Sequence, residues 1–301
     1  MTAAYRERVV TFGVSRGLVG ILTGPRDAGQ CDAPHVIVLN SGVLHRVGGN
    51  RMHVRLARAL SAEGITTLRF DLSGIGDSER RPDVGSLRES VERDIAEAME
   101  YLAASQRATT FVVMGLCSGA FDAMNAAVRD ERVVGAIMVD LPGPFQTWRY
   151  IAYNIGRRLL RAKSWRGAHA KAAFHLRALA SSFTPERNQD DSGRHVVGGR
   201  SRESRKRVQG QFDTLLGRGV RLLVVFTPGV ETNYNHRSLF RTTFPRAAAH
   251  PALEFEYFAT ADHTFSRERE RTRLVERVVA WMTPYRRRSS ISRAYAVSVP
   301  R

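Results

Sequence analysis

Hydrophobic residues along the chain fall into short continuous runs that alternate with longer amphipathic stretches. A continuous aliphatic run of strand length is typical of a strand buried on both faces of a sheet. Apolar residues spaced three and four apart predict helices instead. The alternation predicts parallel strands connected by helices, which is an α/β fold. The expected buried strands are "HVIVLN" (35–40), "ITTLRFD" (65–71), "ATTFVVMG" (108–115), "VVGAIMVD" (133–140), "VRLLVVFTP" (220–228) and "ALEFEYFA" (252–259).

The N-terminal runs and the helices complete this pattern. "RVVTFGV" and "GLVGILTGP" are separated by a short turn, so we expect an antiparallel pair near the N-terminus. Helical spacing predicts helices over 50–64, 86–105, 118–129 and 266–282. Ser86 followed by Glu89 matches a capping box, in which the two side chains satisfy backbone groups at the start of a helix.

The regular alternation is interrupted once, between residues 142 and 217. This stretch combines basic amphipathic segments with a polar, Gly- and Arg-rich segment. We therefore expect one core in two parts, 1–141 and 218–284, with a basic helical lid inserted at 142–217. Residues 285–301 are expected to form a flexible basic C-terminal tail.

Basic residues are concentrated in the insertion and the tail. The chain has 46 Lys plus Arg against 29 Asp plus Glu, a formal net charge of +17. Positions 157–221 hold 16 basic and 5 acidic residues. One interpretation is an anionic substrate, such as a coenzyme A thioester or an acyl group on an acidic carrier protein; the other is a solvated Arg-rich surface. Nucleic-acid binding is disfavoured, because few aromatic residues are interleaved with the basic ones.

Several function classes and locations are disfavoured by the composition. The two cysteines, Cys31 and Cys117, lie far apart in a chain with 43% apolar residues, which favours a reducing compartment. The N-terminus is charged where a signal peptide needs an apolar core, and no window approaches the roughly 20 apolar residues of a membrane span. We expect a cytoplasmic protein. No metal-type Cys/His cluster and no phosphate-binding glycine loop is found, so no cofactor or metal is expected.

The stretch "VVMGLCSGAFDA" (112–123) carries the most specific chemical signal. Gly115 and Gly119 flank Cys117 where a buried strand meets a helix, and small residues there permit a strained turn that exposes a nucleophile. The positive end of the following helix favours a thiolate over a thiol. Cys117 is therefore the candidate nucleophile. The alternative is a buried cysteine that only fills space, which is the more common role of cysteine on a core strand.

A histidine and an acid follow in the chain order that such a nucleophile requires. His263 lies in a polar loop between the last strand and the last helix, which suits a general base. Two acids compete. Glu231 follows the strand before the histidine strand and is preferred; Asp140, at the end of the strand before that, is the alternative. Asp262 neighbours the base in sequence but is expected to point away from it.

Backbone groups near Cys117 are candidates for an oxyanion hole. Ser118 would contribute its N–H at the start of the helix. The second donor is expected from the loop after 35–40, where Gly42 and Val43 are candidates and the Val43 N–H is preferred. His45 in the same loop would border the pocket or face solvent. The turn "GIGDS" (74–78) lacks the third glycine and the immediate helix of a dinucleotide motif, so we assign it a structural role.

Taken together, "NSGVLHRVGGNRMHVRLARALSAEGITTLRFDLSGIGDSE", "VVMGLCSGAFDA" and "ADHTFS" resemble the α/β-hydrolase superfamily, over nearly the whole chain. Within it, the chain looks most like the bacterial serine-aminopeptidase-like hydrolases, especially the exosortase-system-associated branch. The resemblance implies a mostly parallel eight-stranded sheet with helices on both faces and a helical lid. It also implies Cys117 as nucleophile and His263 as base. The chain departs at the acid, where "GVETNYNH" replaces the usual aspartate and makes Glu231 a displaced match.

The expected activity is hydrolysis of an ester or thioester through a Cys–His–acid triad and a covalent acyl-enzyme. A thiolate handles activated acyl groups more readily than amides, because expelling an amine demands more help from the acid. One alternative is acyl transfer with the same triad, since the elbows of dienelactone hydrolases and polyester synthases are also similar. The other is a noncatalytic binding protein on a hydrolase scaffold.

Overall fold

The computed structural model describes residues 5–14, 16–26, 33–82, 85–142, 202–228 and 237–297. Within these ranges eight strands form one sheet, in the order β1-β2-β4-β3-β5-β6-β7-β8. The strands are β1 Tyr5–Phe12, β2 Leu18–Pro25, β3 His35–Val38, β4 Thr67–Phe70, β5 Phe111–Leu116, β6 Val133–Val139, β7 Arg221–Phe226 and β8 Leu253–Tyr257.

The strands pair as the short N-terminal connection and the continuous apolar runs predict. β1 and β2 pair antiparallel, as their short connection predicts, and β2 also pairs antiparallel with β4. From β4 to β8 every neighbouring pair is parallel. The continuous apolar runs at positions 35–40, 108–115, 133–140 and 220–228 form the centre of this parallel part, where a strand is covered on both faces. The predicted α/β architecture and the mostly parallel eight-stranded sheet are therefore confirmed.

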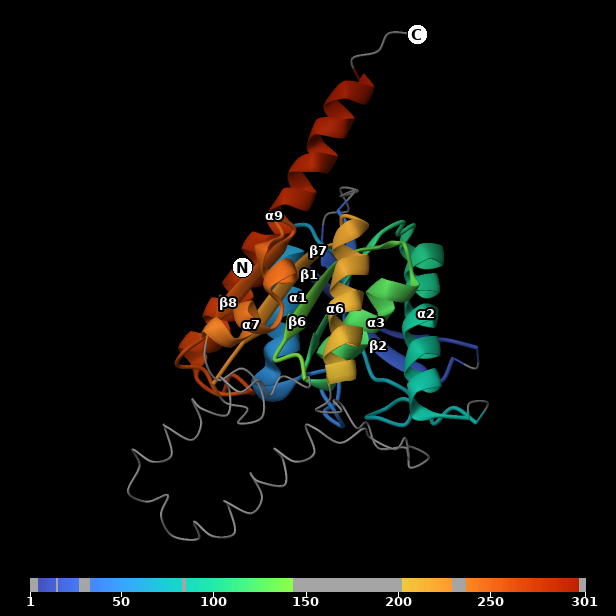
Figure 1. Cartoon of the computed structure of the whole chain (residues 1–301). Coiled ribbons are helices and arrows are strands. Elements are labelled where there is room, and N and C mark those ends of the chain that lie inside the picture. Colours follow the sequence, from blue (N-terminus) through green and yellow to red (C-terminus); the bar gives the residue numbers. More distant parts are fainter. Residues whose placement is uncertain are drawn as a thin grey trace.

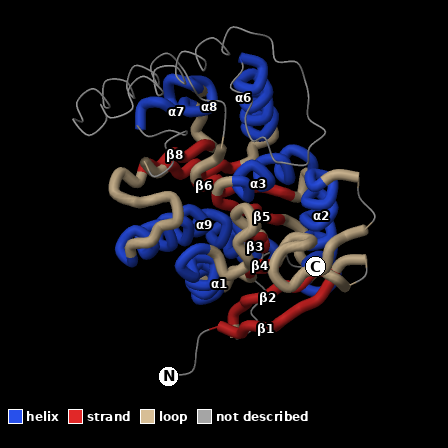
Figure 2. The backbone as a smooth tube through the Cα atoms, turned by 90° about the horizontal axis from the view of Figure 1, so that it is seen from below, coloured by secondary structure: helices blue, strands red, loops and turns tan. Residues whose placement is uncertain are grey.

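Helices cover both faces of the sheet (Figure 2). α1 and α9 pack on one face, and α2, α3 and α6 pack on the other. Along β5, Phe111 and Val113 contribute to the core under α2 and α3, while Val112 and Met114 contribute to the core under α1 and α9. The helices are α1 Met52–Ala62, α2 Leu87–Gln106, α3 Ser118–Arg129, α6 Arg202–Gly217, α7 Arg237–Thr243, α8 Pro245–Ala249 and α9 Glu268–Val297, with a short 3₁₀ helix, η1, at Gly49–Arg51.

The start of α2 confirms the predicted cap by Ser86, but not the reciprocal bond of a full capping box, because Glu89 binds the Gly85 N–H and not the Ser86 N–H. The Glu89 N–H donates to the Ser86 hydroxyl oxygen at 3.2 Å. The Glu89 carboxylate accepts from the Gly85 N–H at 3.3 Å. The Ser86 cap satisfies one backbone donor that the first turn of a helix leaves unpaired.

The boundary of the predicted lid needs correction at its C-terminal end. Residues 202–217 were assigned to the lid, but they form α6, whose Val208, Phe212 and Leu215 are buried in the core beside α3. The start of this helix is rich in Arg, and the prediction therefore overlooked the regular spacing of apolar residues further along it. The remainder of the predicted insertion, residues 143–201, lies outside the described residues.

Most of the predicted C-terminal tail has helical conformation. Residues 285–297 continue α9 as one helix through Pro284, and this end of α9 projects away from the body of the molecule (Figure 1). Arg has high helix propensity, so this segment with its four Arg can continue a helix that the core has already nucleated.

The carboxyl ends of β5, β6, β7 and β8 lie side by side in the sheet order. The loops that leave these ends carry the candidate nucleophile, one candidate acid and the candidate base. In open parallel sheets this edge is where ligands bind. Among the described residues, no helix combines the length and hydrophobicity needed to cross a bilayer.

Candidate active site

Cys117 lies at a strained turn between β5 and α3. Its backbone has φ 56° and ψ −120°, a left-handed conformation that is rare for a residue with a side chain. The turn is held from both sides: the Cys117 N–H donates to the Val139 carbonyl at 2.9 Å, and the Cys117 carbonyl accepts from the Ala120 N–H at 3.0 Å. The side chain is half-buried rather than enclosed in the core. This is the sharp strand-to-helix turn that the glycine spacing predicts.

The two glycines of the motif are required by close backbone contacts. A Cβ on Gly115 would lie 2.1 Å from the Gly119 carbonyl group, because the start of α3 folds back over the end of β5. A Cβ on Gly119 would lie 2.3 Å from the Asn40 carbonyl oxygen. The opposing atoms in both contacts belong to the backbone, so no movement of a side chain could make room for the added Cβ. The G-x-C-x-G pattern thus reflects the local geometry.

His263 and Asp140 meet above the ends of β6 and β8. The His263 Nδ1 lies 2.8 Å from the Asp140 Oδ2. Asp140 is fully buried, directly follows β6 and has a positive φ of 48°. Its carboxylate also accepts from Thr227, at 2.7 Å from the backbone N–H and 2.8 Å from the hydroxyl. These donors hold the carboxylate in one orientation toward the imidazole.

The imidazole also bonds to the elbow cysteine. The hydrogen bond to Asp140, and then the hydrogen bond to the Cys117 side chain, raise the pKa of His263 to about 10. Its side chain is 28% exposed, so one edge of the imidazole remains open to solvent. His263 thus contacts Asp140 directly and interacts with the Cys117 side chain, and both neighbours favour its imidazolium form.

The loop that carries His263 is organised by its own side chains. Asp262 accepts hydrogen bonds from the backbone N–H groups of Thr264 and Ser266 and from both of their hydroxyls. Partial burial raises the pKa of Asp262, but these hydrogen bonds outweigh it and lower the pKa to about 2. Arg271, on α9, donates to the Phe265 carbonyl at 2.8 Å. As predicted, Asp262 points away from the imidazole and shapes the turn instead.

The loop after β3 contacts the elbow through Ser118. The Gly42 N–H donates to the Ser118 hydroxyl oxygen at 2.8 Å, linking residues 76 positions apart in sequence. Gly42 has φ 56°, and the neighbouring Val43 is 88% exposed. The Gly42 N–H is therefore engaged with Ser118, which leaves Val43 as the stronger candidate of the two for an oxyanion donor. His45 is exposed and its Nδ1 accepts from the Val47 N–H at 3.1 Å.

A buried network of hydrogen bonds also holds the loop after β3 in place. The Asp71 carboxylate, fully buried after β4, accepts from the Arg46 backbone N–H at 2.6 Å and pairs with the Arg46 guanidinium. The Asn40 amide bridges the Leu44 carbonyl at 2.7 Å and the Asp71 carboxylate at 3.3 Å. The Asp77 N–H, in the turn 74–78, also donates to Asp71. The turn that superficially resembles a dinucleotide motif therefore has a structural role, as expected.

The comparisons with known proteins are consistent with this architecture. Residues 42–298 match the Alpha/beta hydrolase family. The chain belongs to that family. A search of curated proteins gave no match. The fold is similar to that of proline iminopeptidase from Mycobacterium smegmatis (TM-score 0.59, 17% identity, 93% of this chain and 99% of that one). It is also similar to the esterase domain of a Rhodothermus marinus protein (TM-score 0.54, 20% identity, 94% and 99%).

In this alpha/beta hydrolase the described residues bring together Cys117, His263 and Asp140, all named from the sequence. Glu231, the preferred acid, lies outside the described residues. The acid that contacts the histidine is thus the alternative, Asp140. Sequence reasoning missed Thr227, which orients that acid; its position directly after β7, beside the end of β6, was the available signal.

Metal binding has no support within the described ranges. No group of three or more His, Cys, Asp or Glu side chains there is arranged to hold a metal ion.

Proposed function

We propose that this alpha/beta hydrolase cleaves an ester or thioester bond, with Cys117 as nucleophile, His263 as acid–base and Asp140 as the acid that orients it. The observation that carries the proposal is the hydrogen bond between His263 and the buried Asp140, beside the Cys117 thiol, which also raises the pKa of His263. The strained backbone of Cys117 supports it independently, since strain of this kind is retained where surrounding structure and function require it.

The proposed reaction has two steps. The Cys117 sulfur attacks the acyl carbon, and the carbonyl oxygen takes up negative charge next to the N–H groups of Ser118 and Val43. The tetrahedral intermediate then collapses, and the imidazolium of His263 gives its proton to the leaving alcohol or thiol. In the second step His263 takes a proton from water, whose oxygen attacks the thioester. The acid leaves and Cys117 regains its sulfur electron pair.

The charge state of His263 explains why a thiol suits this site. With a pKa near 10, His263 is an imidazolium over most of the pH range in which enzymes work. An imidazolium cannot remove a proton from a serine hydroxyl, but it stabilises a thiolate beside it. Cys117→Ser is therefore expected to lose nearly all activity, although the two side chains have similar shapes.

The substrate class follows from the nucleophile and the charge of the chain. Thiolates favour activated acyl groups, so esters and thioesters rank above peptides. The basic residues between positions 157 and 221 support a substrate with an anionic leaving group, such as coenzyme A or an acidic carrier protein. Within the family, the motif supports placement near the exosortase-system-associated branch.

The test is turnover by matched variants. Hydrolysis of p-nitrophenyl butyrate and of butyryl-coenzyme A is measured for the wild type, Cys117→Ala, His263→Ala and, as the control, Cys31→Ala. We expect a loss of about 10³-fold or more in the first two variants and none in the control. Turnover that survives in Cys117→Ala, with circular dichroism unchanged, would refute the nucleophile and favour a binding protein on a hydrolase scaffold.

A further inference from the structure

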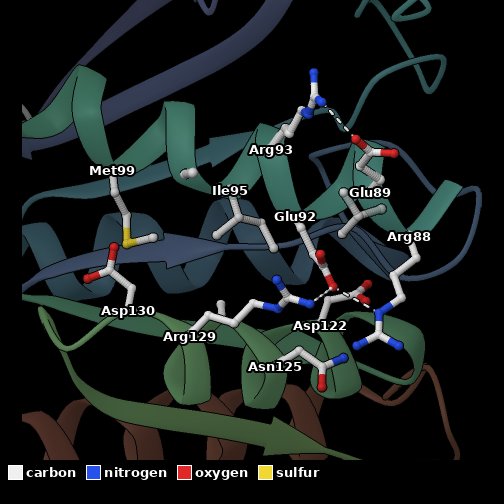
Figure 3. A pocket seen from close by; sticks show the side chains of 13 residues that line it. Arg88, Glu89, Glu92, Arg93, Ile95, Met99, Asp122, Asn125, Arg129 and Asp130 are labelled. Carbon is white, nitrogen blue, oxygen red and sulfur yellow. Dashed lines mark hydrogen bonds and ion pairs between the residues drawn. The ribbon is translucent and has the colours of Figure 1, made fainter. Parts of the chain in front are cut away.

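A cavity lies between α2 and α3, on the side of the sheet where these helices pack. It has a volume of about 420 Å³, within the range of small-molecule sites. Its lining comes from one face of each helix: Arg88, Glu92, Ile95 and Met99 on α2 repeat at helical spacing, and Asp122 contributes from α3 (Figure 3). None of the site residues described above lines it.

Each arginine at the cavity is engaged by a carboxylate, although Arg88 and Arg129 share one. Arg88 and Arg129 both bind the Glu92 carboxylate, at 2.8 and 2.9 Å. Arg93 binds Glu89 at 2.7 Å. With Asp122 and Asp130 ionised, the lining holds three cations and four anions, a net charge of −1. An anionic ligand would therefore have to displace an existing carboxylate partner.

Asp122 is the carboxyl in this lining that makes no hydrogen bond or ion pair within the described part of the chain. It is 8% exposed, and burial and the charge of Glu92 raise its pKa by more than the charge of Arg88 lowers it. Figure 3 shows it reaching from α3 toward Glu92 and Arg88, while the guanidinium of Arg88 is engaged by Glu92. Because Asp122 lines the cavity and makes no hydrogen bond to the described residues, a ligand in the cavity could supply the donors that a buried carboxylate requires.

We propose that the cavity between α2 and α3 binds an amphipathic cation, an ammonium or guanidinium group on an apolar body, with Asp122 as its anchor. The apolar body would lie against Val91, Ile95, Ala96, Met99 and Ala126, which form the hydrophobic part of the lining. The cationic head would supply hydrogen-bond donors and a direct ion pair, which Asp122 does not have among the described residues. This site is separate from the proposed catalytic triad and does not depend on it.

Binding of such a cation is coupled to a proton. Burial, and then the charge of Glu92, raise the pKa of Asp122 to about 7, so below neutral pH the empty cavity holds a neutral acid. A cation stabilises the carboxylate, and the acid gives up its proton when the cation binds. At pH 6 the binding of one cation should release close to one proton, whereas a neutral ligand should release none.

The experiment compares three probes with the same apolar body: phenethylammonium, 2-phenylethanol and 3-phenylpropionate. Calorimetry in two buffers of different ionisation enthalpy gives the affinity and the number of protons released. We expect phenethylammonium to bind at least about tenfold more tightly than the alcohol, with proton release at pH 6. Asp122→Asn should remove both the preference and the proton release.

A matched variant distinguishes a specific contact with Asp122 from an effect of the overall charge of the cavity. Asp130→Asn removes another carboxylate of the lining, one that already binds Arg132 at 2.8 Å, and should keep the preference for the ammonium. Equal affinity of the wild type for the alcohol and the ammonium, tighter binding of the propionate, absence of proton release, or no binding at 10 mM would each overturn the proposal. The wild-type measurements decide this even if a variant does not fold. Binding is measured without turnover, so failure here leaves the catalytic proposal intact.

Discussion

Asp140 and Asp122 lie on either side of the nucleophile elbow, one at the end of β6 and one on α3, and the chain surrounds them differently. Asp140 is fully buried and accepts hydrogen bonds from Thr227 as well as contacting His263. Asp122 is almost as buried and has no partner among the described residues. Burial alone therefore does not define the role of a carboxylate; the donors that surround it do.

The difference in donors assigns the two acids different tasks. A carboxylate held by fixed donors can orient and stabilise an imidazolium without moving. A carboxyl in a cavity without donors is neutral or ionised according to its surroundings, and so responds to pH and to ligands. The comparison shows that fixed donors hold the acid after β6 in one orientation, as its proposed catalytic role requires, whereas the acid on α3 has no such donors, as its proposed binding role requires. The following predictions test each half.

Asp140→Asn should have the largest effect. The loss of the carboxylate removes the charge that stabilises the His263 imidazolium, so the pKa of His263 should fall from about 10 and kcat/KM should fall by roughly 10² to 10⁴-fold. NMR titration of His263 and ester hydrolysis measure the two quantities. Asp213→Asn, an acid-to-amide change at an exposed site paired with Arg246, is the control. An unchanged His263 titration in Asp140→Asn would mean that another acid holds the histidine.

Asp122→Asn should stabilise the protein at high pH. The raised pKa of Asp122 means that the native state binds more protons than the unfolded chain between about pH 4 and 7, so the free energy of unfolding falls with rising pH across this window. Each pKa unit is worth about 1.4 kcal/mol, which gives a stabilisation of a few kcal/mol for the variant at pH 8 and little at pH 4. Urea unfolding at both pH values checks this. Equal stability of the two proteins at pH 8 would contradict the unpartnered state of Asp122.

His263 should affect stability in a different pH window. Its pKa is raised above the ordinary 6.5, so the charged imidazole stabilises the native state fully below about pH 6.5, and this contribution is lost as pH rises through 10. The wild type should thus exceed His263→Gln in stability at pH 6, and the gap should narrow toward pH 10. A gap that is constant over this range would show that the histidine is not held as an imidazolium.

Thr227→Val should have a moderate effect that isolates the orientation of Asp140. The substitution removes the hydroxyl donor at 2.8 Å and keeps the backbone donor, so the carboxylate loses one of its two Thr227 contacts. A hydrogen bond to a charged group contributes about 1.5–3 kcal/mol, which predicts a fall of at least about tenfold in kcat/KM. Thr227→Ser retains the hydroxyl and should recover most of the activity. If valine and serine behave alike, the hydroxyl does not orient the acid.

Ser118→Ala should have the smallest effect. It removes the acceptor for the Gly42 N–H and so loosens the contact between the elbow and the loop after β3. The Ser118 N–H itself remains, so we expect a loss of about tenfold or less in kcat with KM nearly unchanged. Steady-state kinetics on p-nitrophenyl butyrate separate the two constants. A loss as large as that of Asp140→Asn would assign Ser118 a more direct part than positioning.

The sequence predicted the sheet and the elbow because local patterns specify them. Continuous apolar runs identify buried strands, and Gly115 and Gly119 are dictated by backbone contacts within the turn and with the neighbouring strand end. Ser86 and Glu89 likewise act within one helical turn. These features depend on contacts between residues that are close in sequence, or between strand ends that the fold class places side by side. They can therefore be predicted without the tertiary structure.

The acid and the boundaries could not be predicted in the same way. Strand position favoured Glu231, but the contact between Asp140 and His263 depends on how the end of β6 turns, and the positive φ of Asp140 leaves no sequence signal. The lid boundary was wrong because charge density at the start of α6 outweighed the buried Phe212 further along. The unpartnered state of Asp122 is a tertiary property of the α2–α3 cavity.

The most direct test of the central claim is the rate at which iodoacetamide alkylates Cys117 between pH 5 and 9, measured in a Cys31→Ala background. A free thiol has a pKa of about 8.5, and its alkylation slows in proportion as pH falls below that value. The account predicts a rate that persists well into the acidic range and falls when His263→Ala or Asp140→Asn is introduced. A slow rate that rises only as an ordinary thiol ionises, with no response to His263→Ala, would contradict the catalytic triad.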